Sequence, residues 1–157
     1  MFKPGNAFTR SLFAGCTLVM LAACGTTVSK VDNNGKTDAP IFKTVEQANR
    51  PDGSYVNLES LSKIREGMDK KQLFELIGPP HYAEGLFNVR EWDYVLKIRQ
   101  AEGLPDKVCQ YKILFDEQMA ARSFYFKPAD CIDHVAAAAE RHQLKRLSQY
   151  DQTAHRD

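Results

Sequence analysis

Three stretches of alternating apolar and polar residues limit what this 157-residue chain can fold into. The even positions of residues 91–99 are apolar, and so are the odd positions from Cys109 to Phe115. A period of two residues is typical of a strand with one buried face. In the third stretch, residues 120–127, we take Phe124 and Phe126 as the inward pair. The short connections predict a three-stranded antiparallel meander with one solvated face.

Two helices are predicted before the strands. Asn57 can cap the first, and Gly67 is placed to end it. Asp69 can cap the second, with Gln72 positioned to bond back to the cap, and Gly78 followed by two prolines ends it. The apolar positions at helical spacing are Leu58, Leu61 and Ile64 in the first helix, and Leu73, Leu76 and Ile77 in the second. We expect these two helices to cover the apolar face of the sheet.

A third helix is predicted near the C-terminus. It starts after Asp130, Asp133 is a plausible cap, and an alanine-rich run gives it strong helix propensity. Its apolar stripe is thin, so it packs weakly or awaits a partner. The expected fold class is therefore α+β, with two N-terminal helices packed on a three-stranded antiparallel meander sheet, plus a C-terminal helix.

The N-terminus has the pattern of a lipoprotein signal. Lys3 and Arg10 lead into an apolar run over residues 11–23, which is too short to span a bilayer, and Leu-Ala-Ala-Cys closes it at Cys24. We expect cleavage before Cys24 and acylation of this residue with two or more chains, which anchors a protein stably to a membrane surface. An ordinary signal peptide or a short membrane anchor is the alternative. No aspartate follows the cysteine, which favours the bacterial outer membrane, with the protein facing the periplasm.

The remaining chain divides by its pattern. Residues 1–23 are the signal peptide, 24–56 a lipidated N-terminus and flexible tether, 57–131 the folded domain, and 132–157 a C-terminal helix with a frayed tail. The tether assignment rests on the absence of any sustained period, although residues 41–45 could form a short strand.

The balance of charged residues argues against one class of binding partner. Loss of two basic residues with the signal leaves 19 of the 21 basic side chains against 20 acidic ones. This balance argues against a nucleic-acid partner, which would require a concentrated basic face.

The cysteines that remain predict one disulfide. Cys16 leaves with the signal and Cys24 is acylated, so Cys109 and Cys131 are left in an oxidising compartment. A bridge between them would tie the middle strand to the start of the third helix.

No group of residues points to catalysis. The histidines are His81, His134, His142 and His155. Cys131 and His134 could act as nucleophile and base, or join Asp130 and Asp133 as metal ligands, but the expected disulfide and the lack of a second ligand pair argue against both. Residues 78–81 lack the lysine and hydroxyl residue of a phosphate loop. We expect a non-enzyme without a cofactor or metal.

Several motifs together resemble a known family. These are the run Lys63 to Pro80 with its Gly67-Met68 pair, then Phe87, then Trp92-Asp93-Tyr94, and then Ile113 to Asp116. They are similar to the SmpA/OmlA (BamE-like) family of outer-membrane lipoproteins over about residues 57–127. The resemblance implies a helix-helix-strand-strand-strand domain without catalysis, which supports the insertion of β-barrel proteins into the outer membrane. The implied partners are proteins of the β-barrel assembly machinery, and phospholipid.

A partner-binding loop is expected between the second helix and the first strand. Phe87 matches in position an aromatic that the family presents to protein or phospholipid, and Asn88 and Arg90 lie beside it. Arg90 could pair with a carboxylate or phosphate. The alternative for Phe87 is burial under the sheet beside Trp92. A second possible function is a periplasmic inhibitor or lipid-binding module on the same fold.

Overall fold

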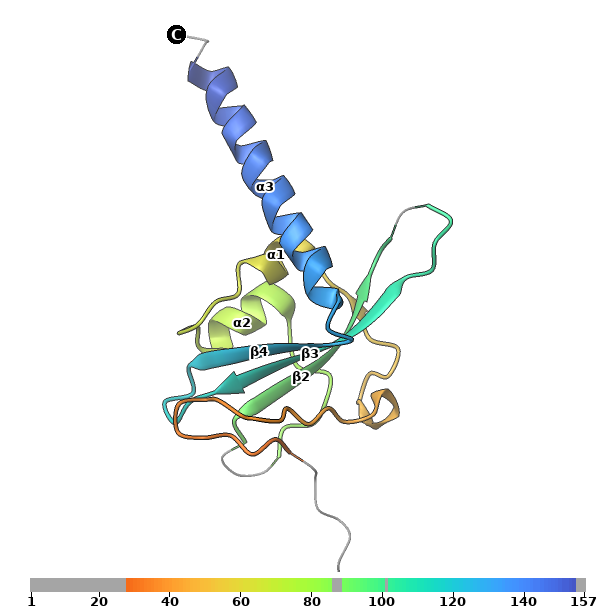
Figure 1. Ribbon diagram of the computed structural model, residues 1–157, viewed down its shortest axis with the longest axis vertical. Helices are drawn as coiled ribbons and strands as arrows, with labels where there is room; N and C mark the ends of the chain where they lie inside the picture. Colours follow the sequence, from red (N-terminus) through yellow and green to blue (C-terminus); the bar gives the residue numbers. More distant parts are fainter. Residues whose placement is uncertain (1–27, 86–88, 101, 155–157) are drawn as a thin grey trace, which may run out of the picture.

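The computed structural model describes residues 28–85, 89–100 and 102–154, with side chains as far as residue 147. The α+β class is confirmed: a mixed sheet carries two short helices on one face, and a long helix rises from one end of the molecule (Figure 1). The elements in chain order are η1 (Val45–Gln47), β1 (Ser54–Tyr55), α1 (Leu58–Ser62), α2 (Lys70–Ile77), β2 (Glu91–Ile98), β3 (Lys107–Phe115), β4 (Ala121–Lys127) and α3 (Cys131–Ala154).

The sheet has four strands rather than the three expected. Strands β2, β3 and β4 form the predicted antiparallel meander, with Trp92 opposite Ile113 and Tyr111 opposite Phe126. The fourth strand, β1, is only two residues long and pairs with β2 in parallel, so the sheet order is β1-β2-β3-β4. Two residues are too few to show an alternating pattern, which is why the sequence did not reveal this strand.

The local signals for α2 are confirmed in atomic detail. The Asp69 side chain accepts a hydrogen bond from the Gln72 backbone N–H at 2.8 Å, and the Gln72 side chain accepts one from the Asp69 N–H at 3.1 Å. Helix α1 is capped by Asn57 as expected, but it ends at Ser62 rather than near Gly67. Gly67 has a φ of 85° and donates its N–H to the carbonyl of Ala121, which joins the segment between the helices to the start of β4.

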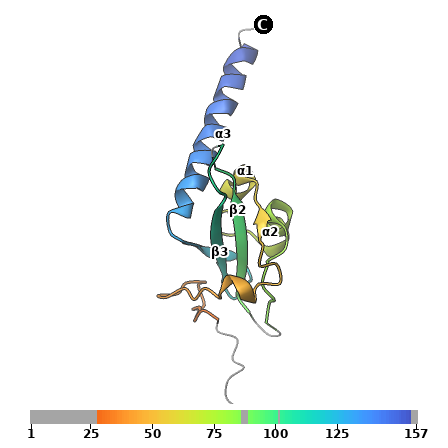
Figure 2. The same cartoon turned by 90° about the vertical axis from the view of Figure 1, so that its right-hand side faces the viewer.

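The main core lies between α1, α2 and the alternating face of the sheet (Figure 2). Trp92 packs edge-to-face with Phe115, and Tyr111 stacks on Phe126. The buried members are Leu61, Met68, Leu73, Trp92, Tyr94, Leu96, Ile98, Cys109, Tyr111, Ile113, Phe115, Ala121 and Cys131. Phe124 and Phe126 pack against this cluster, as the alternation predicted for the third strand.

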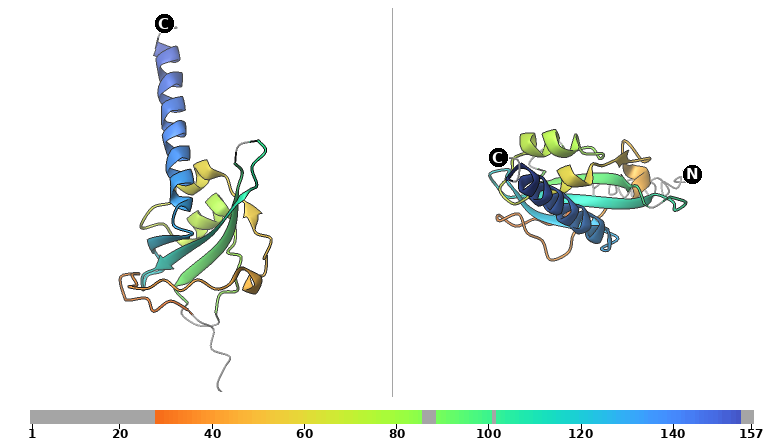
Figure 3. Two further views of the ribbon diagram at one scale, coloured as in Figure 1. Left: turned by 45° about the vertical axis from the view of Figure 1, so that its right-hand side comes forward. Right: turned by 90° about the horizontal axis from the view of Figure 1, so that it is seen from above.

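The opposite face of the sheet is not solvated, contrary to expectation. Residues 28–43, which we call the strap, run out from the start of β2 to β4 and return across β3 (Figures 1 and 3). These residues belong to the stretch that we expected to be a free tether. The polar side chains of β2 and β3 beneath the strap, among them Glu91, Asp93 and Lys112, are consequently buried. The alternating pattern correctly predicted that these residues lie on the second face of the sheet. The pattern does not indicate whether that face contacts water or is covered by another segment of the chain.

Helix α3 projects from the end of the sheet where β4 finishes (Figure 1). It begins at Cys131, so Asp133 lies inside its first turn and is not the cap. Its first half packs beside α1, where His142 Nε2 lies 3.0 Å from Glu59 Oε1. Farther along, Leu144 and Leu147 are each 60% exposed. Among the residues that the structure describes, no helix is long and apolar enough to cross a membrane.

Candidate functional site

Three of the residues predicted as sites, Cys24, Phe87 and Asn88, lie outside the described residues. Arg90 is described, and its guanidinium group binds the strap. Its Nη2 and Nη1 atoms donate to the carbonyls of Val31 and Asp32 at 2.7 and 2.8 Å. The side chain that we expected to meet a partner's carboxylate or phosphate thus uses two of its donors inside the chain, at the start of the strap.

A buried ionic cluster lies beneath the strap at the same end of the sheet. Lys112 is fully buried, and its Nζ lies 2.9 Å from Glu91 Oε2 and 2.8 Å from Asp93 Oδ1. Lys43 of the strap adds a second ammonium group, 3.8 Å from Glu91 and 3.9 Å from Asp93. The two positive charges of the lysines balance the two negative charges of the carboxylates. Buried charges are tolerated when they are paired in this way.

The strap covers this ionic cluster and bonds to it. The backbone N–H of Ser29 donates to Glu91 Oε2 at 3.0 Å, so one strap amide bonds directly to the ionic group. Two carboxylate oxygens, Glu91 Oε1 and Asp93 Oδ2, are buried without a hydrogen bond from the protein. Burial raises the pKa of Asp93, and the nearby Glu91 adds to the rise, whereas Lys112 and Lys43 oppose it. The cluster therefore binds the strap at the cost of incompletely satisfied carboxylates.

The strap is otherwise held mainly through its carbonyl groups. Gln110 Nε2 donates to the carbonyl of Lys43 at 2.7 Å, and Ser123 Oγ donates to that of Gly35 at 2.8 Å. Tyr125 donates to the carbonyl of Thr37 at 3.4 Å. Every residue has a backbone carbonyl, so docking through carbonyls depends little on which side chains the strap carries. The sequence of the strap accordingly shows no helical or strand periodicity.

Two strap residues do fit specific places. The Phe42 ring lies between two lysines, with the Nζ atoms of Lys112 and Lys127 at 5.7 and 5.9 Å from its centroid. Gly35 has a φ of 74°, and a Cβ atom there would come within 2.7 Å of the Arg122 Cβ. Contacts between carbon atoms are normally no closer than about 3.5 Å, so Gly35 is required where the strap meets β4.

His81 links the backbone of β2 to β1. Its Nδ1 accepts a hydrogen bond from the Val95 backbone N–H at 2.9 Å, and its Nε2 lies 3.1 Å from Ser54 Oγ. Since Nδ1 is an acceptor, the neutral ring carries its proton on Nε2 and donates it to Ser54. Nε2 therefore cannot act as a base toward this hydroxyl, and the Ser54–His81 pair is a structural link.

We expect His81 to make the fold sensitive to mild acid. Burial lowers the pKa of His81 below its usual value of 6.5. A histidine whose folded-state pKa is depressed contributes stability that is complete above the unfolded pKa and is lost as the pH falls through the folded pKa. Protonation of Nδ1 would break the bond from Val95, so the unfolding free energy should fall by about 1 kcal/mol between pH 7 and pH 5.

Urea unfolding at a series of pH values would measure this loss. In His81→Asn, the amide oxygen can still accept the Val95 N–H but does not titrate, so its curve should be flatter between pH 7 and pH 5. His134→Asn, at a less buried position on α3, serves as the control and should keep the wild-type slope. Equal slopes for His81→Asn and the wild type would contradict this role of His81.

The segment between the end of α2 and residue 85 is fixed at two places. Tyr94 donates its hydroxyl to the carbonyl of Gly78 at 3.1 Å, where α2 ends. Lys70 bonds to Glu84 at 3.0 Å, and its ammonium lies 5.1 Å from the centroid of the Trp92 ring. The described part of the connection between α2 and β2, which includes Arg90, and the first residues of the strap therefore lie at one end of the molecule, opposite α3 (Figure 1).

The alternative catalytic and metal sites are not assembled. The structure joins Cys109 and Cys131 as a disulfide with Cα atoms 6.1 Å apart, which removes the thiol that His134 would have to activate. Asp130 instead pairs with Lys107 at 2.8 Å. Over the described ranges, no cluster of three or more His, Cys, Asp or Glu side chains could hold a metal ion.

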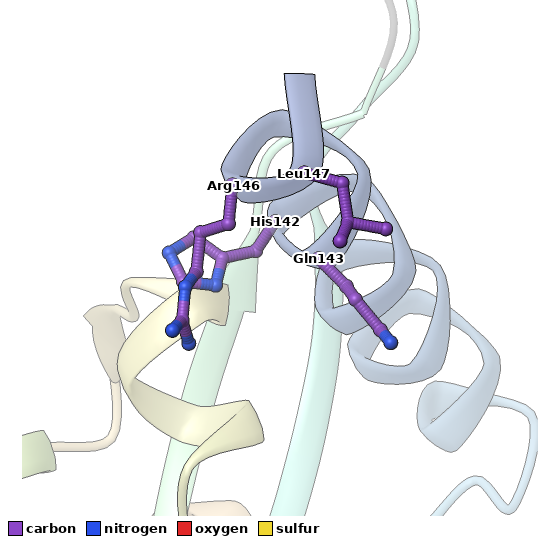
Figure 4. Close-up of a pocket in the computed structure, with 4 residues that line it drawn as sticks. All are labelled: His142, Gln143, Arg146 and Leu147. Carbon is purple, nitrogen blue, oxygen red and sulfur yellow. The ribbon is translucent and has the colours of Figure 1, made fainter. Parts of the chain in front are cut away.

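A surface hollow on α3 offers no reactive group either. His142, Gln143, Arg146 and Leu147 line it, and Figure 4 shows that these four side chains come from the same helix. His142 and Arg146 extend toward α1, whereas Gln143 and Leu147 extend from other sides of the helix. Groups from different elements do not converge here, as a catalytic site would require.

The comparison with known families fits this domain. Residues 53–124 match the family model described as the outer membrane protein assembly factor BamE domain. The match begins just before β1 and ends within β4, so it includes α1, α2 and nearly the whole sheet. The strap and α3 lie outside the matched range.

Proposed function

The chain carries a BamE-family domain, and on this premise we propose that the protein is a non-catalytic outer-membrane lipoprotein that supports the assembly of β-barrel proteins. The family match over residues 53–124 is the observation that carries the proposal. The family is described as an outer membrane protein assembly factor.

The proposed partners are proteins of the β-barrel assembly machinery, with phospholipid as a second contact. The loop at residues 86–90 is the proposed contact, because Phe87 stands where the sequence resembles the family, and Asn88 and Arg90 lie beside it in the sequence. Arg90 belongs to the same end of the molecule, but it also binds the strap. Its substitution would therefore affect both partner binding and the docking of the strap. Phe87 and Asn88 are therefore the better probes.

Affinity purification after cross-linking in intact cells tests this function. We expect the wild-type protein to recover β-barrel assembly components, and Phe87→Ala to recover several-fold less because aromatic anchors dominate many interfaces. Phe74→Ala is the control, since Phe74 is a phenylalanine that is 53% exposed on α2 and does not belong to the loop. Recovery of one soluble hydrolase instead would support the inhibitor function and contradict the assembly role. Equal recovery by Phe87→Ala and wild type would remove the loop from the contact.

We propose that Cys24 is the acylated first residue of the mature protein. The Leu-Ala-Ala-Cys box supports this, and two or more acyl chains are enough for stable anchoring. Metabolic labelling with a fatty acid should mark the wild type and leave Cys24→Ala unlabelled. Cys16→Ala, which changes a cysteine within the signal, is the control and should be labelled like the wild type. Label on Cys24→Ala would contradict the assignment.

A further inference from the structure

The strap controls how far the folded domain can lie from the lipid anchor. We propose that its docking on the sheet holds the end of the domain carrying Arg90 against the lipid surface, with α3 directed away, and that undocking frees the domain to move outward. This inference rests on the proposed acylation of Cys24. It concerns residues 28–43, which lie outside the range matched by the family model.

The reach follows from chain length. Among the described residues, Ser29 is the first that bonds to the sheet, and it is five residues from Cys24. Five residues span at most about 18 Å even when fully extended. If the strap leaves the sheet, the next fixed residue is Thr44, whose carbonyl accepts a hydrogen bond from the Tyr82 hydroxyl, twenty residues from Cys24. Twenty residues reach about 70 Å at full extension and about 25 Å as an average coil.

The orientation follows from where the strap begins. Ser29 bonds to Glu91, the first residue of β2, and Val31 and Asp32 bond to Arg90. Helix α3 begins beyond Lys127, which is opposite Gln110 toward the other end of the sheet. Figures 1 and 2 show the strap and the projecting part of α3 at opposite ends of the molecule. An anchor within about 18 Å of Ser29 therefore directs α3 away from the lipid.

The contacts of the strap make its docking reversible. The strap is held largely by hydrogen bonds and ion pairs. Among its residues only Ser29 and Gly35 are buried. Undocking would let water reach Glu91 Oε1 and Asp93 Oδ2, which lack hydrogen bonds while covered. Hydration of these carboxylates offsets part of the lost contacts, so the docked and undocked states are closer in free energy than for an apolar cover.

Gly35 supplies a substitution that acts on the strap alone. In Gly35→Val, the side chain would meet Arg122 Cβ at 2.7 Å and the Asp116 backbone nitrogen at 3.0 Å, so the strap could not seat on β4. Gly103→Val is the matched control. Gly103 also has a positive φ, 83°, but nothing lies within 4 Å of a Cβ there, and it is far from the strap in the loop between β2 and β3.

The first measurement tests docking without any lipid. Hydrogen exchange of the mature chain carrying Cys24→Ser should show protected amides at Ser29 and Ile41, because both donate hydrogen bonds. Gly35→Val should lose this protection while the amides of β2 and β3 remain protected, and Gly103→Val should keep both. A strap that exchanges freely in the wild-type sequence would overturn the proposal and leave the assembly function untouched.

The second measurement tests the reach in the acylated protein. Trp92 is the single tryptophan and follows Glu91, so it reports on the strap end of the domain. Energy transfer from Trp92 to dansyl-labelled lipid in phosphatidylethanolamine–phosphatidylglycerol vesicles should be about threefold lower for Gly35→Val than for wild type, given the longer coil. Gly103→Val should transfer like wild type. Unchanged transfer after strap protection is lost would overturn the proposal. Failure of acylation, seen directly by intact mass, would instead refute the anchor on which it rests.

Discussion

Lys112→Met should lower the free energy of unfolding by about 3–5 kcal/mol, the usual cost of removing one partner from a buried ion pair. Lys112 is fully buried between Glu91 and Asp93, at 2.9 and 2.8 Å. Methionine fills a similar volume, so the loss would come mainly from the charge. Lys43 would remain, but at 3.8 and 3.9 Å it cannot satisfy both carboxylates. Urea unfolding at pH 7 measures the effect.

The pH dependence identifies the cause of this loss. Without Lys112, the pKa of Asp93, already raised by burial above 3.8, should rise further because the ammonium that opposes the rise is gone. A carboxyl whose folded-state pKa is raised contributes stability below its unfolded pKa and loses it as the pH rises through the folded pKa. The deficit of Lys112→Met should therefore be largest at pH 7 and smaller near pH 4.

Two further variants test whether the loss of stability in Lys112→Met comes from the unpaired buried charges. Lys71→Met changes an exposed lysine on α2 and should alter stability by less than about 0.5 kcal/mol. In Lys112→Met combined with Glu91→Gln and Asp93→Asn, neutral groups replace the unpaired charges, so part of the stability should return. A deficit that stays constant between pH 4 and pH 7 would show that lost packing, rather than unpaired charge, causes the destabilisation.

Loss of the Cys109–Cys131 disulfide should have the next largest effect, about 3 kcal/mol. The two cysteines are 22 residues apart in sequence, and both are completely buried in the main core. The bond closes a loop through β3, β4 and the start of α3, so its removal enlarges the unfolded ensemble. The double variant Cys109→Ala/Cys131→Ala should unfold at lower urea than the wild type. Intact mass of the mature wild type should show the loss of two hydrogen atoms relative to the reduced chain.

A reducing agent provides the control for the disulfide. It should destabilise the wild type and leave the double alanine variant unchanged, because the variant has no bond to reduce. Two free thiols in the wild-type protein under non-reducing conditions would refute the bond. Equal stability of the wild type with and without reductant would show that the bond contributes little to the fold.

The sequence alone determined the elements whose signals are local. The Asp69–Gln72 capping box involves residues three apart, and the alternation in β2 and β3 is visible within eight or nine residues. Short-range hydrogen bonding and one-sided burial leave these patterns directly in the chain. The α+β class, the meander and the resemblance of the domain to the BamE family could be read from such patterns. The pairing of Cys109 with Cys131 followed from elimination, since no other thiol was available.

Only the tertiary structure revealed the strap and what lies beneath it. Ser29 meets Glu91 across 62 residues, and Gly35 meets Ser123 across 88. No local window of sequence contains such contacts, and most of them use strap carbonyls, which all residues possess. Glu91, Asp93 and Lys112 alternate like residues that face water, and their burial depends on a distant segment. Local patterns specified which face each side chain occupies, whereas long-range packing decided which faces are covered.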